Sequence, residues 1–286
     1  MAKQVKISNG KLSAVINYKG AELVSFNDGF REVIWQGDER YWTSHAPILF
    51  PVCGGFKDDC YILDGVKYIM PKHGYVRKVD FSLVESNENS VTFVLSDDKT
   101  SKEGFPFEFD LFVKYILTDK LEIEYKVVNK GKDAMYFTIG AHEGYALEHD
   151  FSEYSIEFET EEDLKSMTLF GNLIGDEYLD LGKSKELKLN YDFFAVDALV
   201  FKDIKSKKFT LKHKEVGEIA SICADDSFKH LLLWTKPGAQ YICIEPWVAL
   251  PDRLDSNQNI VEKPDVVKVC SGESKSFIHT IRGKQV

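Results

Sequence analysis

The sequence predicts an all-β fold, a large antiparallel β-sandwich with few short helices, and three observations support this prediction. Apolar and polar residues alternate with a period of two in seven segments, a pattern typical of strands with one buried face. Short turn sequences rich in Gly, Asn and Asp separate these segments, and short connections favour antiparallel pairing. No segment shows a sustained apolar period of 3.6 residues, so helices should be few and short.

The predicted strands extend along the whole chain. The clearest hairpin covers residues 61–68, where Asp64 and Gly65 supply the positive φ angles that a type I′ turn demands. We expect short helices around residues 38–42 and within residues 161–169. The alternating segments are residues 11–18, 90–95, 111–117, 121–128, 154–159, 209–212 and 277–281.

Length and composition are those of a globular protein with a sizeable core. Sandwiches of about this length, 286 residues, often form one unit, and no change in composition marks a linker. We therefore expect a single domain spanning residues 1–286. Asp and Glu number 46 against 36 Lys and Arg, and the net charge of −10 repels polyanions. We expect no nucleic-acid partner, although a few local basic groups could still hold a small phosphorylated substrate.

The cysteines and the first residues predict a protein of a reducing compartment. The five cysteines are odd in number, scattered and mostly placed in apolar segments, so we expect reduced core residues. Only Cys53 and Cys60 come near each other in sequence, and they lack the CxxC spacing of a zinc site. The polar start of the chain and the shortness of its apolar runs predict a cytoplasmic protein with no membrane partner.

One carboxylate near the C-terminus lies in an unusual setting. Glu245 follows an apolar, partly β-branched run and precedes Pro246 and Trp247. Burial in such surroundings would raise the pKa of the carboxyl towards the range that suits a general base. The alternative interpretation is a strand-end glutamate in a surface salt bridge.

Two histidines lie in segments that suit ligand binding. His73 occurs in the segment MPKHGYVR, residues 70–77, which combines an imidazole, a flexible glycine and a guanidinium. His142 is surrounded by glycine and alanine residues, which leave the backbone open to a ligand. No metal or serine triad of recognisable spacing and no Gly-rich phosphate-binding loop is present.

The other five histidines receive no chemical role. His45 precedes an apolar run, and we interpret it as a buried, hydrogen-bonded structural residue. The remaining four lie among charged residues or in alternating segments, namely His149, His213, His230 and His279.

These segments resemble the aldose 1-epimerases of the galactose mutarotase superfamily, and the LacX-type bacterial branch in particular. The resemblance extends from about residue 8 to the last predicted strand, and its last motif is the most specific. The matching motifs, in the order of the family, are LFP (49–51), MPKHGYVR (70–77), GAH (140–142), DAL (197–199) and CIEPW (243–247).

The resemblance implies a single-domain β-sandwich with a sugar site in an open groove, and mutarotation without a metal or cofactor. Glu245 matches the general base of the family, which takes the proton from the anomeric hydroxyl. His142 matches the general acid, which protonates the ring oxygen. Contacts to the sugar are expected from His73, Asp197, Arg77, Lys57, Trp247 and Tyr145.

Two positions depart from the family pattern. Gly55 stands where LacX-type sequences commonly have an arginine, and Lys57 is a cation two residues further on. Glu143 follows His142 where the family often has a proline, and its carboxylate would favour a protonated His142 if the two side chains approached.

The leading hypothesis is an aldose 1-epimerase that acts on a hexose such as galactose or glucose, as a monomer or homodimer. A hexose-6-phosphate 1-epimerase is an alternative that needs a basic cluster beside the sugar, for which Arg77, Lys57 and Lys72 are the candidates. A non-catalytic sugar-binding relative is a third hypothesis, and an interaction scaffold is a fourth. Convergence of Glu245 and His142 in one open groove would argue against the scaffold.

Overall fold

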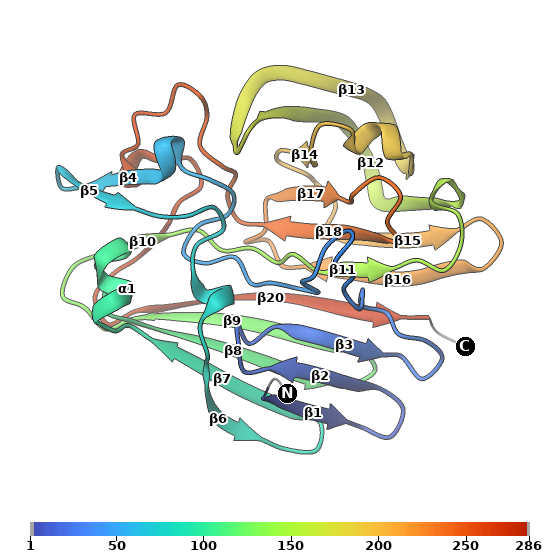
Figure 1. The fold of residues 1–286 in the computed structure, drawn as a ribbon, viewed down its shortest axis with the longest axis horizontal. Helices are drawn as coiled ribbons and strands as arrows, with labels where there is room; N and C mark the ends of the chain where they lie inside the picture. The colour runs from blue at the N-terminus through green and yellow to red at the C-terminus, as the bar shows by residue number, and fades with distance from the viewer. Residues whose placement is uncertain (1–2, 285–286) are drawn as a thin grey trace.

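A computed structural model describes residues 3–284, and antiparallel strands dominate it (Figure 1). One sheet of 13 strands runs through the whole molecule, and all its neighbouring strands are antiparallel. Its spatial order is β11 (Gly144–Ala146), β18 (Tyr241–Trp247), β17 (His230–Trp234), β14 (Leu199–Phe201), β12 (Tyr154–Phe170), β15 (Lys208–His213), β16 (Gly217–Ala224), β20 (Ser274–Gly283), β9 (Leu121–Asn129), β8 (Phe109–Leu117), β7 (Ser90–Ser96) and β6 (Ser82–Ser86), with β13 (Leu173–Lys188) paired to β12.

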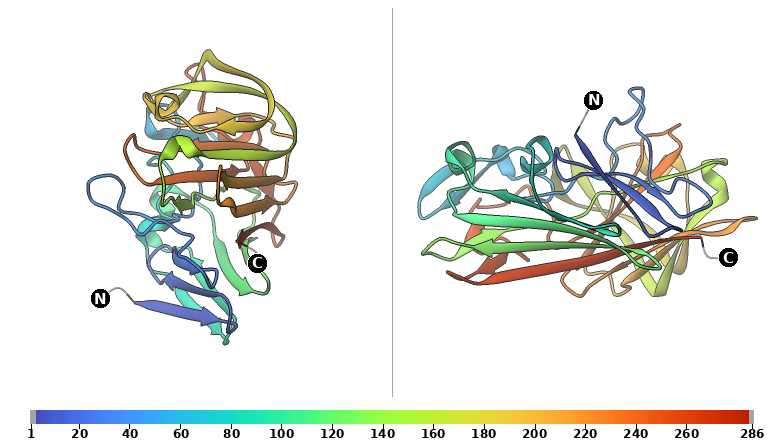
Figure 2. Two further views of the ribbon diagram at one scale, coloured as in Figure 1. Left: turned by 90° about the vertical axis from the view of Figure 1, so that its right-hand side faces the viewer. Right: turned by 90° about the horizontal axis from the view of Figure 1, so that it is seen from below.

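A second layer covers one half of this large sheet. The three-stranded sheet of β1 (Gln4–Ser8), β2 (Ser13–Asn17) and β3 (Leu23–Asn27) packs against β7 and β8, as the two side views show (Figure 2). The Tyr115 hydroxyl of β8 donates to the Ala21 carbonyl across the two layers, at 2.7 Å. The predicted β-sandwich is therefore confirmed. Two two-stranded sheets complete the strands, the hairpin of β4 (Cys60–Leu63) with β5 (Val66–Ile69) and the long-range pair of β10 (Met135–Phe137) with β19 (Val267–Val269).

Burial along the strands follows the alternation in the sequence. In β8 every second residue from Phe109 to Leu117 is buried, and β9 shows the same pattern from Leu121 to Asn129. All seven predicted alternating segments coincide with strands in the structure. The predicted hairpin is also present, since Asp64 and Gly65 have φ angles of 50° and 76° and join β4 to β5.

The two predicted helix positions are wrong. Residues 38–42 form a turn closed by a bridge between Asp38 and Trp42, and residues 161–169 belong to β12. Tertiary contacts override the helix propensity of residues such as Glu162 in this segment. The buried Glu162 carboxylate accepts hydrogen bonds from the Ser206 N–H and hydroxyl. The helices described are few and short, as expected: α1 (Lys99–Gly104) and the 3-10 turns Lys57–Asp59, Val76–Lys78, Phe151–Glu153, Tyr191–Phe194 and Ile260–Glu262.

The cysteines are free, but not all of them are core residues. Cys53, Cys60 and Cys243 are buried, Cys223 is half-buried and Cys270 is exposed. Cys270 lies in the turn before β20, where alternation no longer constrains its exposure. Within residues 3–284, the structure contains no helix that is both long and apolar enough to span a membrane.

Asp252 holds together three segments that come from distant parts of the chain. Its buried carboxylate accepts hydrogen bonds from the Lys57 N–H at 3.1 Å and from the Lys263 ammonium at 2.7 Å. Its backbone N–H donates to the Gly55 carbonyl, and its carbonyl accepts from the Ile174 N–H of β13. The loop at 54–57, the β12–β13 hairpin and the segment at 250–253 are thereby fixed relative to one another.

We predict that Lys263→Met destabilises the protein by about 3–5 kcal/mol, because it leaves the Asp252 carboxylate buried without its cation. Urea unfolding followed by circular dichroism would measure the loss. Lys132→Met removes an exposed lysine and should change stability by less than about 0.5 kcal/mol. A similarly small effect of Lys263→Met would show that the buried ion pair does not fix these segments.

Candidate active site

A cavity of about 490 Å³ opens beside β17 and β18, and it gathers most of the residues selected from the sequence. Six of the eight predicted site residues line it: His73, Arg77, His142, Asp197, Glu245 and Trp247. These residues come from four separate segments of the chain, so only the fold brings them together. The remaining walls are formed by residues including Trp42, Gly54, Lys72, Leu169, Asn172, Val196, Leu232, Trp234, Lys236 and Pro251.

The pleat of β18 places Glu245 on the cavity side. Ile242 and Ile244 point into the main hydrophobic core, so Glu245 and Trp247 point to the opposite face of the sheet. Glu245 pairs with Leu232 of β17, which also lines the cavity. The carboxyl group thus lies on a strand with a neighbour on each side, β11 and β17, and only 1 % of the residue is exposed.

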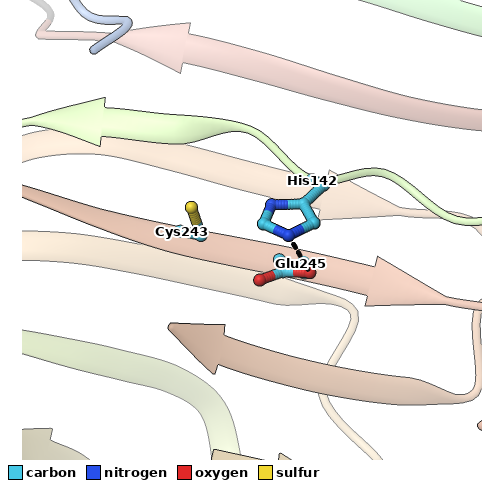
Figure 3. Close-up of side chains that lie close together, drawn as sticks. All are labelled: His142, Cys243 and Glu245. Atoms are coloured by element: carbon cyan, nitrogen blue, oxygen red, sulfur yellow. Dashed lines mark ion pairs between the residues drawn. The ribbon is translucent and has the colours of Figure 1, made fainter. Parts of the chain in front are cut away.

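Glu245 faces His142 across the floor of the cavity (Figure 3). The distance from Glu245 Oε2 to His142 Nε2 is 3.5 Å, within ion-pair range. Among the described residues, neither Glu245 Oε2 nor His142 Nδ1 has a hydrogen-bond partner. Buried polar atoms are usually satisfied, so unpartnered atoms on facing proton-transfer groups indicate a site for a ligand.

Burial disfavours the charged form of both groups. It raises the pKa of Glu245 well above its usual value, while the Lys72 ammonium acts in the opposite direction. It lowers the pKa of His142 to about 3. Burial thus favours a protonated Glu245 and a neutral His142.

Aromatic rings fix the orientation of the His142 imidazole. The Trp42 ring stacks on it with centroids 5.2 Å apart and planes at 28°. Trp234 and His73 contact it edge-on, at centroid distances of 5.8 and 5.7 Å. The sequence did not predict Trp42 and Trp234 as site residues, because no local pattern indicates that these two tryptophans contact the same histidine.

His73 is held in a definite tautomer by the loop at residue 54. Its Nδ1 accepts the Gly54 N–H at 3.1 Å, so a neutral ring carries its proton on Nε2. Burial, with the neighbouring His142 as the next cause, lowers the pKa of His73 well below its usual value. The backbone here needs a glycine at 74, since a Cβ would lie 2.0 Å from the Phe50 carbonyl oxygen. His73 therefore serves as a neutral donor.

Two predicted sugar contacts are not in the cavity. The Lys57 ammonium lies 3.4 Å from the Ser256 carbonyl oxygen, to which it donates. Tyr145 is fully buried, and it pairs with Ile242 on the core side of the sheet. Antiparallel partners point to the same face, so the Tyr145 ring points away from Glu245. We withdraw both residues as sugar contacts.

Glu143 does not influence His142 as expected from the sequence. The Glu143 side chain is buried, and its Oε1 atom lies 2.9 Å from Nε2 of His279 instead of contacting His142. This pair also gives His279 a structural partner that the sequence pattern did not show. His45 is only half-buried, and its backbone N–H donates to the Glu22 carboxylate at 2.8 Å. The Nδ1 atom of its ring has no hydrogen-bond partner among the described residues, so the predicted hydrogen bond of the imidazole is not seen there.

The space next to Gly55 is filled by the β12–β13 turn. A Cβ at position 55 would lie 2.9 Å from Asn172 Cβ, so the turn packs directly on the glycine. Asn172 lines the cavity, so an amide lies beside position 55, where LacX-type sequences commonly have an arginine. A long side chain at position 55 would require the hairpin to move.

Cys243 lies close enough to the pair to complete a possible metal-binding group. The thiol and the ligand atoms of His142 and Glu245 all lie within 4.8 Å of one another (Figure 3). Burial raises the pKa of the Cys243 thiol well above its usual value. Without a metal, the group is therefore an acid–base pair beside a protonated thiol.

Comparison with known proteins identifies the family. The model of the family described as aldose 1-epimerase matches residues 3–281. The chain belongs to the aldose 1-epimerase family. It is 33% identical over 282 residues to protein LacX of Lactococcus lactis subsp. lactis, covering 93% of this chain and 94% of that protein. The predicted resemblance, including the LacX-type branch, is confirmed.

Solved structures show the same fold. A galactose mutarotase related enzyme from Lactobacillus acidophilus has a TM-score of 0.90 at 25% identity, covering 99% of this chain and 98% of that chain. A galactose mutarotase-like protein from Lactobacillus casei has a TM-score of 0.90 at 28% identity, covering 98% and 99% of the two chains. The aldose 1-epimerase fold is thus present over nearly the full length of this chain.

We predict that the His142 imidazole does not titrate between pH 5 and 8. Its lowered pKa means that the neutral ring persists well below the value near 6.5 of a free imidazole. Nuclear magnetic resonance of ¹³C-histidine-labelled protein would follow the ring, with His142→Gln used to assign its signal. A shift with a midpoint near 6.5 would contradict the burial of this ring.

Proposed function

We propose that this family member is a mutarotase that interconverts the α and β anomers of an aldohexose. The observation that carries the proposal is the buried pair of Glu245 and His142, which face each other at 3.5 Å in an open cavity. A sugar-binding module needs hydroxyl contacts, whereas facing proton-transfer groups with shifted pKa values suit general acid–base chemistry.

The reaction requires two coordinated proton transfers. Ring opening breaks the anomeric O–H bond and the C1–O5 bond, and it forms a C1 carbonyl and a new hydroxyl at O5. Rotation about C1–C2 then presents the other face of the carbonyl, and closure reverses both transfers. In the proposed mechanism Glu245 removes the proton from the anomeric hydroxyl and His142 protonates the ring oxygen.

One shared proton is sufficient for this cycle. A neutral Glu245 with a neutral His142 has the same net charge as a carboxylate with an imidazolium, so the desolvation cost of the two ions is offset in part by their mutual attraction. The Lys72 ammonium stabilises an ionised Glu245, but Lys72 and Arg77 both disfavour a protonated His142. In the proposed mechanism the state with Glu245 ionised and His142 protonated starts ring opening, although it is not the state that burial favours at rest.

The other cavity residues suit the binding of sugar hydroxyls. His73 offers its Nε2–H, as its tautomer dictates. Asp197 Oδ1 already accepts the Ala198 N–H at 2.8 Å, which orients the carboxylate and leaves its second oxygen for a hydroxyl. Trp247 presents an indole whose N–H is engaged with the Ala141 carbonyl at 3.1 Å, so its ring is held for contact with a sugar.

We predict that Glu245→Gln lowers the enzyme-catalysed rate by about 10²–10⁴-fold, the usual contribution of one positioned proton transfer. Polarimetry on freshly dissolved α-D-galactose and α-D-glucose would measure the rate above the spontaneous reaction. Glutamine keeps the size and the hydrogen-bonding capacity of the side chain but cannot take the proton.

Tyr145→Phe is the matched control, because Tyr145 is equally buried in the neighbouring strand but lies on the core side of the sheet. It should retain the wild-type rate within about twofold, in keeping with its distance from the chemistry. If wild type and Glu245→Gln accelerate both sugars equally, Glu245 is not the base. If neither accelerates a neutral or a charged aldose, the proposed function fails.

A further inference from the structure

We propose that the aldose taken by this cavity carries an anionic group, which Lys72, Arg77 and Lys236 attract. This inference rests on the proposed function, since Glu245 and His142 fix the position of C1 and the ring oxygen. All three cationic residues line the cavity. The chemical class of the ligand is therefore a phosphorylated or carboxylated aldose.

The three cations lack carboxylate partners. Within residues 3–284, none of them forms an ion pair. Ion pairs involve 12 of the 36 Lys and Arg residues within the described part of the chain, for example Lys263 with Asp252, so the lack of a partner is common. What distinguishes these three cations is that they line one cavity of a chain whose net charge is −10.

Arg77 is the clearest of the three. Its side chain is half-buried, and burial lowers the pKa of its guanidinium. Its one described hydrogen bond goes from Nη2 to the Lys72 carbonyl at 3.3 Å, while the buried Nε has no partner in the described part of the chain. The Glu22 carboxylate raises the pKa of Arg77 through its charge, but it forms no ion pair with Arg77 and accepts the backbone N–H of His45. A partly desolvated guanidinium without a partner is costly unless a ligand supplies the anion.

The cavity has too few negative charges to balance these cations. Glu245 and Asp197 are its two carboxyl residues. Burial favours the neutral form of Glu245, as its raised pKa shows, so Asp197 alone opposes three positive groups. The cavity therefore has a surplus of positive charge even though the protein as a whole is acidic.

The cations come from two segments of the chain. Lys72 and Arg77 flank His73 in the loop at residues 70–78, while Lys236 lies in the exposed turn after β17, beyond Trp234. A volume of about 490 Å³ is within the usual range of small-molecule sites, roughly 300–1,000 Å³, and accommodates a hexose with one more group. An arginine and two lysines suit a phosphate dianion, which accepts several charge-assisted hydrogen bonds.

The test compares neutral and anionic sugars under identical conditions. Exchange between anomers at equilibrium, followed by nuclear magnetic resonance, gives kcat/KM for glucose, glucose 6-phosphate and glucuronate. We expect the wild-type value for an anionic sugar to exceed that for glucose by about ten- to hundredfold, the range for one charge-assisted contact. The better of the phosphate and the carboxylate identifies the anionic group.

Arg77→Met and Lys236→Met should each lower the ratio of kcat/KM between the anionic sugar and glucose by about tenfold. Lys57→Met is the matched control, because it removes a cation of the same charge outside the cavity, and it should leave the ratio unchanged. Lys236 is exposed, so its variant is expected to fold even if Arg77→Met does not.

A wild-type ratio near one would overturn the anionic-sugar inference while leaving mutarotation of free hexoses intact. So would a ratio that Lys236→Met and Lys57→Met change equally. If no sugar were turned over, the proposed function would fail, and calorimetric affinities for the same three sugars would test the charge preference separately. Equal affinity for glucose and the two anionic sugars would then exclude the anionic ligand.

Discussion

The Glu245 carboxyl group is buried on β18, between β11 and β17, and the surrounding structure compensates for the cost of holding it there. The alternation of β18 directs Ile242 and Ile244 into the core, so Glu245 must point into the cavity. Because both side chains are buried, the pKa of Glu245 is raised and that of His142 is lowered, and the Lys72 ammonium is the main charge that opposes the shift of Glu245. The acid–base properties of the site thus follow from burial on a rigid sheet.

Rigid supports from distant segments give the cavity its shape. Asp252 connects the loop at 54–57 with the β12–β13 hairpin, and the same loop holds His73 through the Gly54 N–H. On the other side, Trp42 stacks on His142 and fixes the plane of its ring. A site supported in this way needs little reorganisation when a sugar enters, which favours catalysis over weak, adaptable binding.

The cavity wall carries more positive than negative side chains, whereas the protein as a whole is acidic. The acidic chain discourages polyanions, yet the cavity wall presents Lys72, Arg77 and Lys236 without carboxylate partners in the described residues. Local charges at short range outweigh a distributed net charge, because solvent and salt screen the distant carboxylates. The overall acidity of the protein therefore does not determine which small molecules it accepts.

The sequence by itself determined the all-β class, the strand positions and the motifs that contain Glu245, His142 and His73, because strand periodicity and motif composition are local properties. The tertiary structure decided which residues share the cavity. Tyr145 and Lys57 are near these motifs in sequence but lie outside it, whereas distant side chains from Trp42, Asn172 and Lys236 line it. The face of the sheet to which a side chain points, and the loops that pack beside it, depend on pairing between distant strands. No single segment of the sequence encodes that pairing.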